Sequence, residues 1–189
     1  MSTARRKKRD SKRGASRRKP SRAKRRKRIV PRIASRPEMV RVRRSRVHGR
    51  GVFALRRIRK GTRIIEYLGD RITHKQADVR YEDKSDRDSH TFLFIVDRGA
   101  VIDAGVNGND ARFINHCCDP NCESVIDDRR VFIEAIRTIR IGEELNYDYQ
   151  IGGDRTDPPD VDEIFACRCG ANGCRGSMLW PPKRKARSK

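Results

Sequence analysis

Near its C-terminus the chain carries three cysteines that cannot complete a tetrahedral metal site on their own. Cys167, Cys169 and Cys174 form a C-x-C-x4-C pattern within FACRCGANGCRGSMLW (165–180), and the glycines of this segment permit the tight turns that such a cluster needs. A structural zinc site holds four ligands, so three thiolates leave one position to be filled. The fold must therefore bring a fourth ligand to this cluster from another part of the chain.

One other segment contains cysteine, and it is crowded with polar groups. RFINHCCDPNC (112–122) holds Cys117, Cys118 and Cys122, and its Asp-Pro step prevents a long helix or strand. Any of the three is a candidate for the missing ligand. Three disulfides are the alternative for six cysteines, but there is no secretory signal, and a reducing compartment disfavours disulfides. Zinc is therefore the predicted cofactor of the cysteines.

The formal net charge of +22 lies almost entirely at the two ends of the chain. Residues 1–28 contain 16 Lys/Arg and one acid, residues 183–189 contain five bases and no acid, and +2 remains for residues 29–182. Such a composition cannot form a core, so we expect a disordered basic tail over 1–37 and a short basic tail over 183–189. The tails either bind nucleic-acid phosphates without sequence preference or act as solubilising or targeting segments.

The sequence contains no apolar run typical of a secretory signal or of a transmembrane helix. We therefore expect an intracellular protein without a membrane partner. The compartment stays open between a bacterial cytoplasm or nucleoid and a eukaryotic nucleus or chromosome.

Between the tails, short apolar segments separated by Gly, Asn and Asp turns predict a mainly β domain with little helix. Two segments are expected to be helical, HKQADVRYED (74–83) and NDARFIN (109–115). The segments expected to be strands are MVRVRRS (39–45), GVFALRRI (51–58), RIIEYLG (63–69), TFLFIV (91–96) and RVFIEAI (130–136).

Five ordered motifs give residues 40–180 a family resemblance. They are VHGRGVFA (47–54), EYLGD (66–70), RFINHCCDPNC (112–122), GEELNYDY (142–149) and CRCGANGCRG (167–176). With these motifs the chain resembles a SET-domain protein lysine methyltransferase with a post-SET zinc segment. The resemblance implies a SET fold of small curved, β-clip-like sheets over 38–152, with a threaded pseudoknot that brings 112–122 beside 142–149. The post-SET zinc segment would span 153–182.

The resemblance also implies a binding site for S-adenosylmethionine and a complete zinc site. The Asn-His-x-Cys pattern of the family selects Cys118 as the ligand that joins Cys167, Cys169 and Cys174. Cys117 stands where the family commonly has Ser, which adds another thiol near the metal. The residues implied for cofactor binding are His48, Arg50, Gly51, Arg112, Asn115 and His116.

The resemblance further implies that both tyrosines of NYDY act in methyl transfer. Tyr149 matches the family's active-site tyrosine, and Tyr147 stands at its Phe/Tyr switch position. A tyrosine at the switch position implies mainly monomethylation, because its hydroxyl can hold a water or the amine and so resist a bulkier product. Phe92 occupies a place where many members have Tyr, so it is not assigned to binding.

Acidic residues at 78–88 and 148–163 would suit a Lys/Arg-rich protein substrate such as a histone or histone-like tail. Their alternative is solvated loops. The alternative to an enzyme is a non-catalytic, zinc-containing chromatin or nucleoid-binding protein in which the fold supports the basic tails. In either case we expect a monomer.

Overall fold

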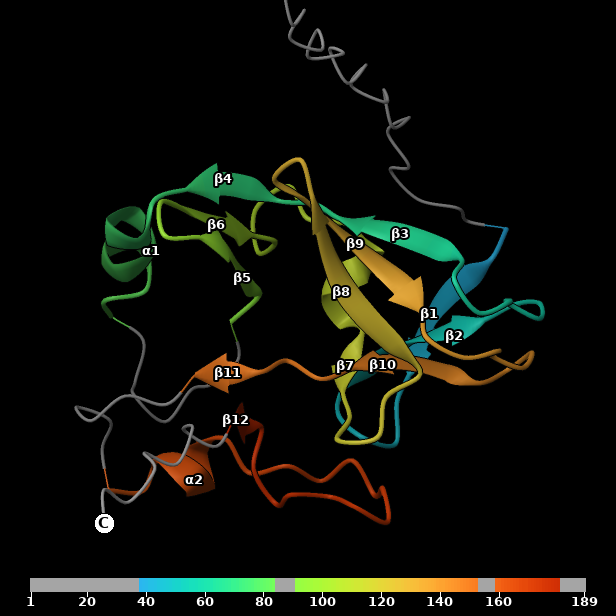
Figure 1. Cartoon of the computed structure of the whole chain (residues 1–189). Coiled ribbons are helices and arrows are strands. Elements are labelled where there is room, and N and C mark those ends of the chain that lie inside the picture. Colours follow the sequence, from blue (N-terminus) through green and yellow to red (C-terminus); the bar gives the residue numbers. More distant parts are fainter. Residues whose placement is uncertain (1–37, 84–90, 153–158, 181–189) are drawn as a thin grey trace, which may run out of the picture. The chain divides into compact units, whose positions relative to one another are not determined.

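The computed structural model describes residues 38–83, 91–152 and 159–180, all within one compact unit, Arg32–Lys189 (Figure 1). The helices are α1 (His74–Arg80), the 3-10 helix η1 (Asp110–Phe113) and α2 (Val161–Ile164). The strands are β1 (Val40–Arg44), β2 (Arg50–Ala54), β3 (Arg63–Tyr67), β4 (Asp70–Ile72), β5 (Leu93–Asp97), β6 (Ala100–Asp103), β7 (Asn115–His116), β8 (Cys122–Asp127), β9 (Arg130–Ala135), β10 (Glu144–Tyr147), β11 (Ile151–Gly152) and β12 (Leu179–Trp180).

The described strands form small separate sheets, which confirms the predicted mainly β fold. Their orders are β1-β2-β10-β7, β3-β9-β8, β4-β6-β5 and β11-β12. The predicted tails, 1–37 and 183–189, lie outside the described residues. All five predicted strands and both predicted helical segments are present, with the 109–115 segment reduced to one 3-10 turn because its flanking residues are extended.

Alternating side chains explain the register of the first sheet. Val42 pairs with Val52 and Val40 pairs with Ala54 in the antiparallel ladder of β1 and β2. These apolar residues pack into the core, while Arg41 between them is exposed. A slip by one residue would bury the arginine and expose the valines, so hydrophobic burial fixes this pairing.

The longest pairing, that of β8 with β9, belongs to a sheet that also contains β3. Ile64, Ile65, Val131 and Ile133 have no exposed surface, and Ile65 pairs with Ile133 across the antiparallel ladder. β-branched residues suit such a surface because their side chains pack tightly on a pleated sheet. This sheet is the centre of the hydrophobic core.

Helix α1 begins at a complete capping box. The Thr73 hydroxyl accepts from the Gln76 backbone N–H, and the Gln76 side chain accepts from the Thr73 N–H, which satisfies two backbone donors at the helix start. At its other end Arg80 donates to the fully buried Asp103 of β6 at 2.6 Å. The helix is therefore anchored to the β4-β6-β5 sheet.

One pairing decides where distant motifs meet. β7 and β10 are parallel neighbours, with Asn115 opposite Asn146 and His116 opposite Tyr147. On its other side β10 pairs with β2. The segment 112–122 therefore lies beside 142–149 and close to the turn after β1, as the resemblance implies.

Candidate functional site

Four thiols from two distant segments meet in space. The sulfur atoms of Cys118, Cys167, Cys169 and Cys174 lie within 4.8 Å of one another. Cys118 follows β7, and its Sγ lies 3.7 Å from the Sγ of Cys167. Four thiol ligands at one point fit a tetrahedral zinc ion, which thiolates bind preferentially. The structure thus brings together the four cysteines predicted as a zinc site.

The other two cysteines, Cys117 and Cys122, lie outside the group of four thiols. The Cys117 thiol is buried and donates to the backbone oxygen of Asp119 at 3.3 Å. Cys122 starts β8 and is fully buried, and burial raises the pKa of its thiol to about 12. A protonated, enclosed thiol is a poor metal ligand. Neither residue belongs to the group of four.

The turns of the C-terminal segment explain how three cysteines reach one point. Gly170 and Gly176 have positive φ angles of 73° and 76°, a region that L side chains rarely adopt. The Cys167 N–H donates to the Gly176 oxygen at 2.9 Å, which closes the loop that contains Cys169 and Cys174.

His116 connects the thiol cluster to the segment of Tyr149, which follows β10. The residue is 4% exposed, its Nδ1 accepts from the Tyr149 backbone N–H at 3.2 Å, and its Nε2 lies 3.4 Å from the Cys118 Sγ. Burial lowers the pKa of His116, although Asp148 opposes this effect. A neutral imidazole with an accepting Nδ1 must carry its proton on Nε2. Both ring nitrogens are therefore engaged within the protein.

Asn115 holds the turn that precedes β2. Its Nδ2 donates to the backbone oxygens of His48 and Arg50 at 3.3 and 2.9 Å, and to the Glu144 Oε1 at 2.9 Å. A Cβ at Gly51 would collide with the Glu144 carboxylate. The amide and the glycine thus fix the position of the turn, and a ligand bound here would meet a surface that Asn115 has shaped.

Two arginines flank one phenylalanine beside this turn. The guanidinium of Arg50 lies 3.7 Å from the ring centroid of Phe113, and that of Arg112 lies 4.7 Å from it. Arg112 Nη1 donates to the Ala104 oxygen at 2.9 Å. Its Nε is buried without a hydrogen-bond partner within the described residues, which is costly unless a ligand supplies an acceptor.

The chemistry of these groups fits S-adenosylmethionine, whose amino-acid portion carries a carboxylate. Positive guanidinium groups and one open buried donor suit that carboxylate, whereas the space beside Gly51 is filled by the Glu144 side chain and not by a ligand. His48, Arg50, Gly51, Arg112, Asn115 and His116 all lie on β2, η1, β7 or the turn before β2. Cofactor contact by each of them stays a prediction.

The two tyrosines predicted for catalysis lie against each other. The ring centroids of Tyr147 and Tyr149 are 4.9 Å apart, and the Tyr149 hydroxyl donates to the Ile114 oxygen at 2.8 Å. Tyr67, which the sequence analysis did not single out, donates to the Phe92 oxygen at 3.1 Å. Burial raises the pKa of all three tyrosines. Each hydroxyl is therefore neutral at physiological pH.

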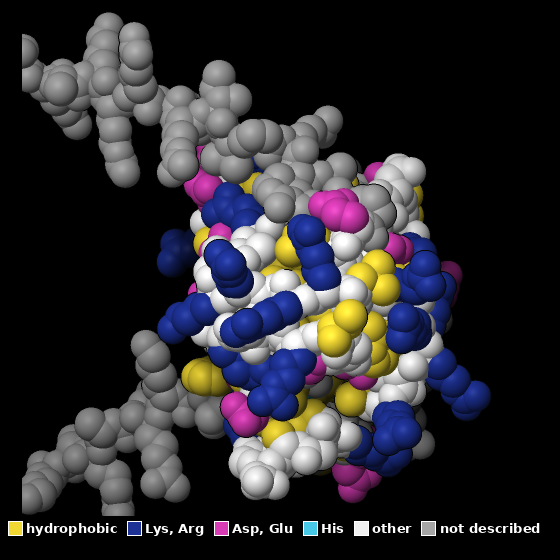
Figure 2. All heavy atoms as spheres, turned by 90° about the vertical axis from the view of Figure 1, so that its right-hand side faces the viewer, with side chains coloured by type: hydrophobic (Ala, Val, Ile, Leu, Met, Phe, Trp, Pro, Cys, Tyr) yellow, Lys and Arg dark blue, Asp and Glu magenta, His cyan; other side chains and the backbone are white. Residues whose placement is uncertain are grey.

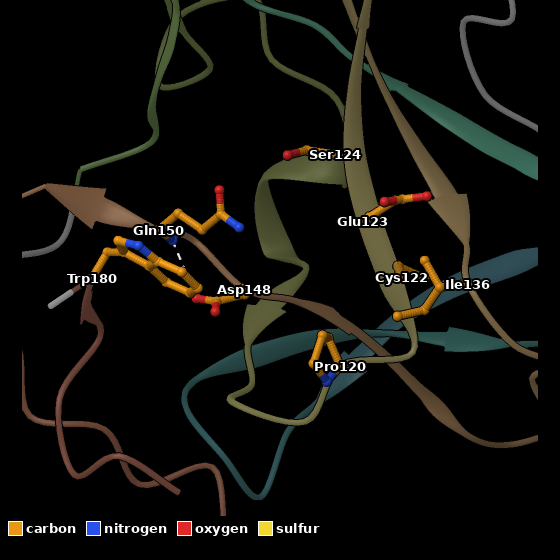
Figure 3. A pocket seen from close by; sticks show the side chains of 8 residues that line it. All are labelled: Pro120, Cys122, Glu123, Ser124, Ile136, Asp148, Gln150 and Trp180. Carbon is orange, nitrogen blue, oxygen red and sulfur yellow. Dashed lines mark hydrogen bonds between the residues drawn. The ribbon is translucent and has the colours of Figure 1, made fainter. Parts of the chain in front are cut away.

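A cavity of about 450 Å³ lies beside Asp148 of the NYDY segment (Figure 3). Trp180 and Gln150 lie on one side of it and the β8 residues on the other, with Asp148 between them in the view. None of the predicted cofactor residues lines it. The lining residues are Pro120, Cys122, Glu123, Ser124, Ile136, Asp148, Gln150 and Trp180.

Trp180 is one of the residues of this cavity that the sequence analysis did not single out. It is the single Trp of the chain and follows the last cysteine by six positions, but a lone aromatic residue has no pattern that reveals where it packs. The pairing of β12 with β11 brings it opposite Gly152. Its ring lies 5.3 Å from the Arg175 guanidinium, a cation–π contact that orients both side chains.

The predicted acidic surface is only partly available to a substrate. Asp148 accepts from both terminal nitrogens of Arg175, at 2.8 and 2.9 Å, so this carboxylate is already neutralised. Asp162 and Glu163 on α2 are exposed. The remaining described members are Asp78, Glu82, Asp83 and Asp160, whereas Asp86, Asp88, Asp154 and Asp157 lie outside the described residues.

Within the described part of the chain, no helix has the length and apolar character needed to cross a membrane.

Comparisons with known proteins agree with this arrangement. The chain is 40% identical over 136 residues to the histone-lysine N-methyltransferase trithorax of Drosophila melanogaster, and 41% identical over 140 residues to the H3 lysine-4 specific histone-lysine N-methyltransferase of Saccharomyces cerevisiae. These matches cover 70% and 71% of this chain, but only 4% and 13% of those proteins.

A third relative is the histone-lysine N-methyltransferase set1 of Dictyostelium discoideum, 39% identical over 153 residues, which are 77% of this chain and 10% of that protein. The chain thus spans a small part of the length of these relatives. The profile of the SET domain matches residues 49–150, which include β2, the β7 segment and both tyrosines. The chain belongs to the SET-domain family.

Proposed function

We propose that the protein is an S-adenosylmethionine-dependent protein-lysine N-methyltransferase. The observation that carries the proposal is the contact between the rings of Tyr147 and Tyr149. His116 accepts from the Tyr149 backbone N–H and contacts the Cys118 thiol, so it connects this pair to the thiol cluster. Two neutral phenols beside a turn held by Asn115, Tyr147 buried and Tyr149 partly buried, offer hydrogen-bonding groups in a site that is partly shielded from water. The names of the relatives, histone-lysine N-methyltransferases, support the same reaction.

The bound cofactor supplies an electrophilic methyl group on a sulfonium. The protein's task is to hold a neutral lysine amine in line with that methyl group, and such alignment can account for much of the acceleration. Tyr149 is suited to this task because its hydroxyl is fixed by the Ile114 oxygen and keeps free lone pairs. These lone pairs can accept from the polarised methyl group or from the amine.

Neither tyrosine is suited to act as the base that removes the lysine proton. Burial raises the pKa of Tyr147 and Tyr149, so neither is a phenolate near neutral pH. A lysine ammonium has an ordinary pKa of about 10.4 and must lose its proton before it attacks. Repulsion from the bound sulfonium would favour the neutral amine, and the proton would leave to solvent.

Mainly monomethylation is the proposed outcome, because Tyr147 is a tyrosine. Its side chain is buried and packs against Tyr149, so its hydroxyl occupies space that a methylated amine would need for a second transfer. Tyr147→Phe should raise the share of dimethyl and trimethyl products, whereas Tyr149→Phe should nearly abolish transfer. The two side chains share one face of an extended segment, so a purely structural role would give the two variants similar effects.

The proposed substrate is a Lys/Arg-rich protein, histone or histone-like, in chromatin or a nucleoid. Exposed acids at α1 and α2 favour a basic peptide over an acidic one. The basic tails would add salt-dependent contacts with nucleic acid, and Cys118, Cys167, Cys169 and Cys174 would hold zinc. We propose that the protein acts as a monomer.

Methyl transfer from labelled S-adenosylmethionine to histones and to short basic peptides tests the proposal, with products resolved over time by mass spectrometry. We expect labelled monomethyl-lysine from the unmodified protein. A folded, zinc-loaded protein that neither binds the cofactor nor labels any basic substrate would favour the non-catalytic chromatin protein instead. Abundant trimethyl-lysine, or an unchanged product distribution in Tyr147→Phe, would refute the role given to Tyr147.

A further inference from the structure

Charge is unevenly distributed along residues 38–182, although the net charge of this region is zero. Residues 38–60 contain nine Lys/Arg and one acid, a net charge of +8, whereas residues 61–182 contain 15 Lys/Arg and 23 acids, a net charge of −8. The segment 38–60 forms β1, β2 and the start of the β2–β3 connection. Basic charge is therefore concentrated in one part of the fold.

Hydrogen bonds of the backbone gather this charge on one surface. The Leu55 N–H donates to the Met39 oxygen at 2.8 Å, which ties the β2–β3 connection to the start of β1. Ile58 and Ile139 exchange two hydrogen bonds, of 3.0 and 2.9 Å, which ties the same connection to the β9–β10 connection. We call the resulting surface the basic face; its members are Arg41, Arg56, Arg57, Arg59, Lys60 and Arg140.

All six side chains of the basic face are exposed, and none makes an ion pair with another described residue. Several arginines elsewhere differ in this respect: Arg63, Arg80, Arg130 and Arg175 each pair with a carboxylate. Figure 2, which views this side of the molecule, shows Lys and Arg side chains spread over it with few acidic ones among them. The charge is therefore free to attract a polyanion.

Protection of an edge strand does not account for the whole basic face. Charged residues on an edge strand such as β1 prevent pairing with other chains, and this explains Arg41. Arg56, Arg57, Arg59 and Lys60 lie in a connection that has no open edge to protect. Like charges packed into five residues also repel one another, so their presence calls for a ligand that neutralises them.

We propose that the basic face binds the phosphate backbone of nucleic acid directly, in addition to any contact made by the tails. Five of its six members are arginines, whose planar guanidinium groups match phosphate oxygens in two-point hydrogen bonds. In the sequence, β1 is preceded by residues 1–28, which carry 16 further Lys/Arg. The face would hold the domain against nucleic acid, while the acidic part of the fold remains available to a basic protein chain.

Salt dependence of DNA binding by the full chain tests this proposal, since each lost phosphate contact reduces the log–log slope by about 0.9. The variants are Arg56→Gln/Arg57→Gln and Arg59→Gln/Lys60→Gln. The matched control, Lys75→Gln/Arg98→Gln, removes two exposed charges from α1 and the β5–β6 turn. With a short duplex DNA as the probe, we expect each basic-face variant to flatten the slope by about one to two and the control to leave it unchanged.

Equal slopes for all three variants would overturn the proposal, because only net charge or the tails would then matter. Loss of binding to vesicles containing phosphatidylserine, with duplex DNA binding unchanged, would also overturn it in favour of a membrane. Methylation of a short free peptide should be the same in all variants. A failure of peptide methylation in the unmodified protein would refute the proposed enzyme and leave the DNA result intact.

Discussion

The β3-β9 pair and the C-terminal segment 159–180 are stabilised by different physical means. On β3 and β9, Ile64, Ile65, Val131 and Ile133 are completely buried. Within 159–180, by contrast, no residue is buried. Burial of apolar surface contributes about 25 cal/mol per Å² to the free energy of folding. This contribution can stabilise the core, but it cannot stabilise a segment in which no residue is buried. The segment depends on links to the core, namely Cys118, the β11-β12 pairing and the ion pair between Asp148 and Arg175.

The largest effect should follow from breaking the thiol cluster. Structural zinc contributes about 10–16 kcal/mol of apparent binding free energy in small domains, which is more than any other link of 159–180 can supply. Cys118→Ser, or chelation of the metal, should make this segment sensitive to protease and remove methyl transfer, while the core keeps most of its melting transition. Cys117→Ser is the matched control, and it should retain stoichiometric zinc and protease resistance.

This outcome would sharpen the contrast between the two regions. If chelation unfolded the core together with the segment, the two would form one cooperative unit. If Cys118→Ser kept zinc with unchanged affinity, the assignment of the fourth ligand would be wrong.

A smaller loss of stability, which affects the whole fold, is expected from a cavity in the core. Ile133→Ala leaves a cavity in a fully enclosed site, and such substitutions lower the free energy of unfolding by about 2–5 kcal/mol. Chemical denaturation measures this loss. Ile95→Ala removes the same atoms from a side chain that is 64% exposed, so it should cost far less. Equal costs would mean that burial does not distinguish these positions.

The next effect concerns a buried carboxylate and depends on pH. Burial alone would raise the pKa of Asp103, but hydrogen bonds from Arg80, Tyr81 and the Gly105 N–H outweigh it, and the pKa is lowered. A lowered pKa stabilises the fold above the unfolded value of about 3.9, and this stabilisation disappears as the pH falls through the folded value. Asp103→Asn should therefore cost about 1–3 kcal/mol at neutral pH.

The pH series separates this electrostatic effect from a packing defect. The difference in unfolding free energy between the unmodified protein and Asp103→Asn should shrink as the pH is lowered below about 4. A difference that stays constant down to acid pH would show that the ionised carboxylate is not what stabilises this site.

The sequence predicted the parts of the fold that follow from local pattern. Alternation predicted the strand at 39–45, and HKQADVRYED was expected to be helical, which places α1 within 74–83. The spacing of Cys167, Cys169 and Cys174 implied a missing ligand, and the family resemblance selected Cys118, which the structure places beside them. These features depend on near neighbours in the chain or on motifs shared by a family.

Long-range contacts could not be predicted from the residues themselves. The short strands β7 and β11 have two residues each, too few for any periodic pattern. The pairing of Asn115 with Asn146 is set by the threading of the chain, which follows from the packing of the whole domain. Trp180 and Arg175 follow the cysteines without any spacing that reveals the cavity that Trp180 lines or the ion pair of Arg175 with Asp148.

The smallest effect should come from the ion pair that joins the two regions. The side chains of Arg175 and Asp148 are 25% and 14% exposed, and pairs near solvent contribute up to about 1 kcal/mol. Arg175→Met should therefore lower the free energy of local opening of 159–180 by only about 0.5–1 kcal/mol. It should not release zinc. Arg175→Lys keeps the charge but loses the two-point hydrogen bond to the carboxylate, so its effect should be intermediate.

Hydrogen exchange of the β12 amides measures this local opening, because opening exposes these amides long before the core unfolds. High salt should reduce the difference between the unmodified protein and Arg175→Met, since partly exposed charges are screened. If Arg175→Met instead released the segment as completely as Cys118→Ser does, the ion pair would be a principal link rather than a minor one. The metal would then no longer explain why a segment without a buried residue stays folded against the core.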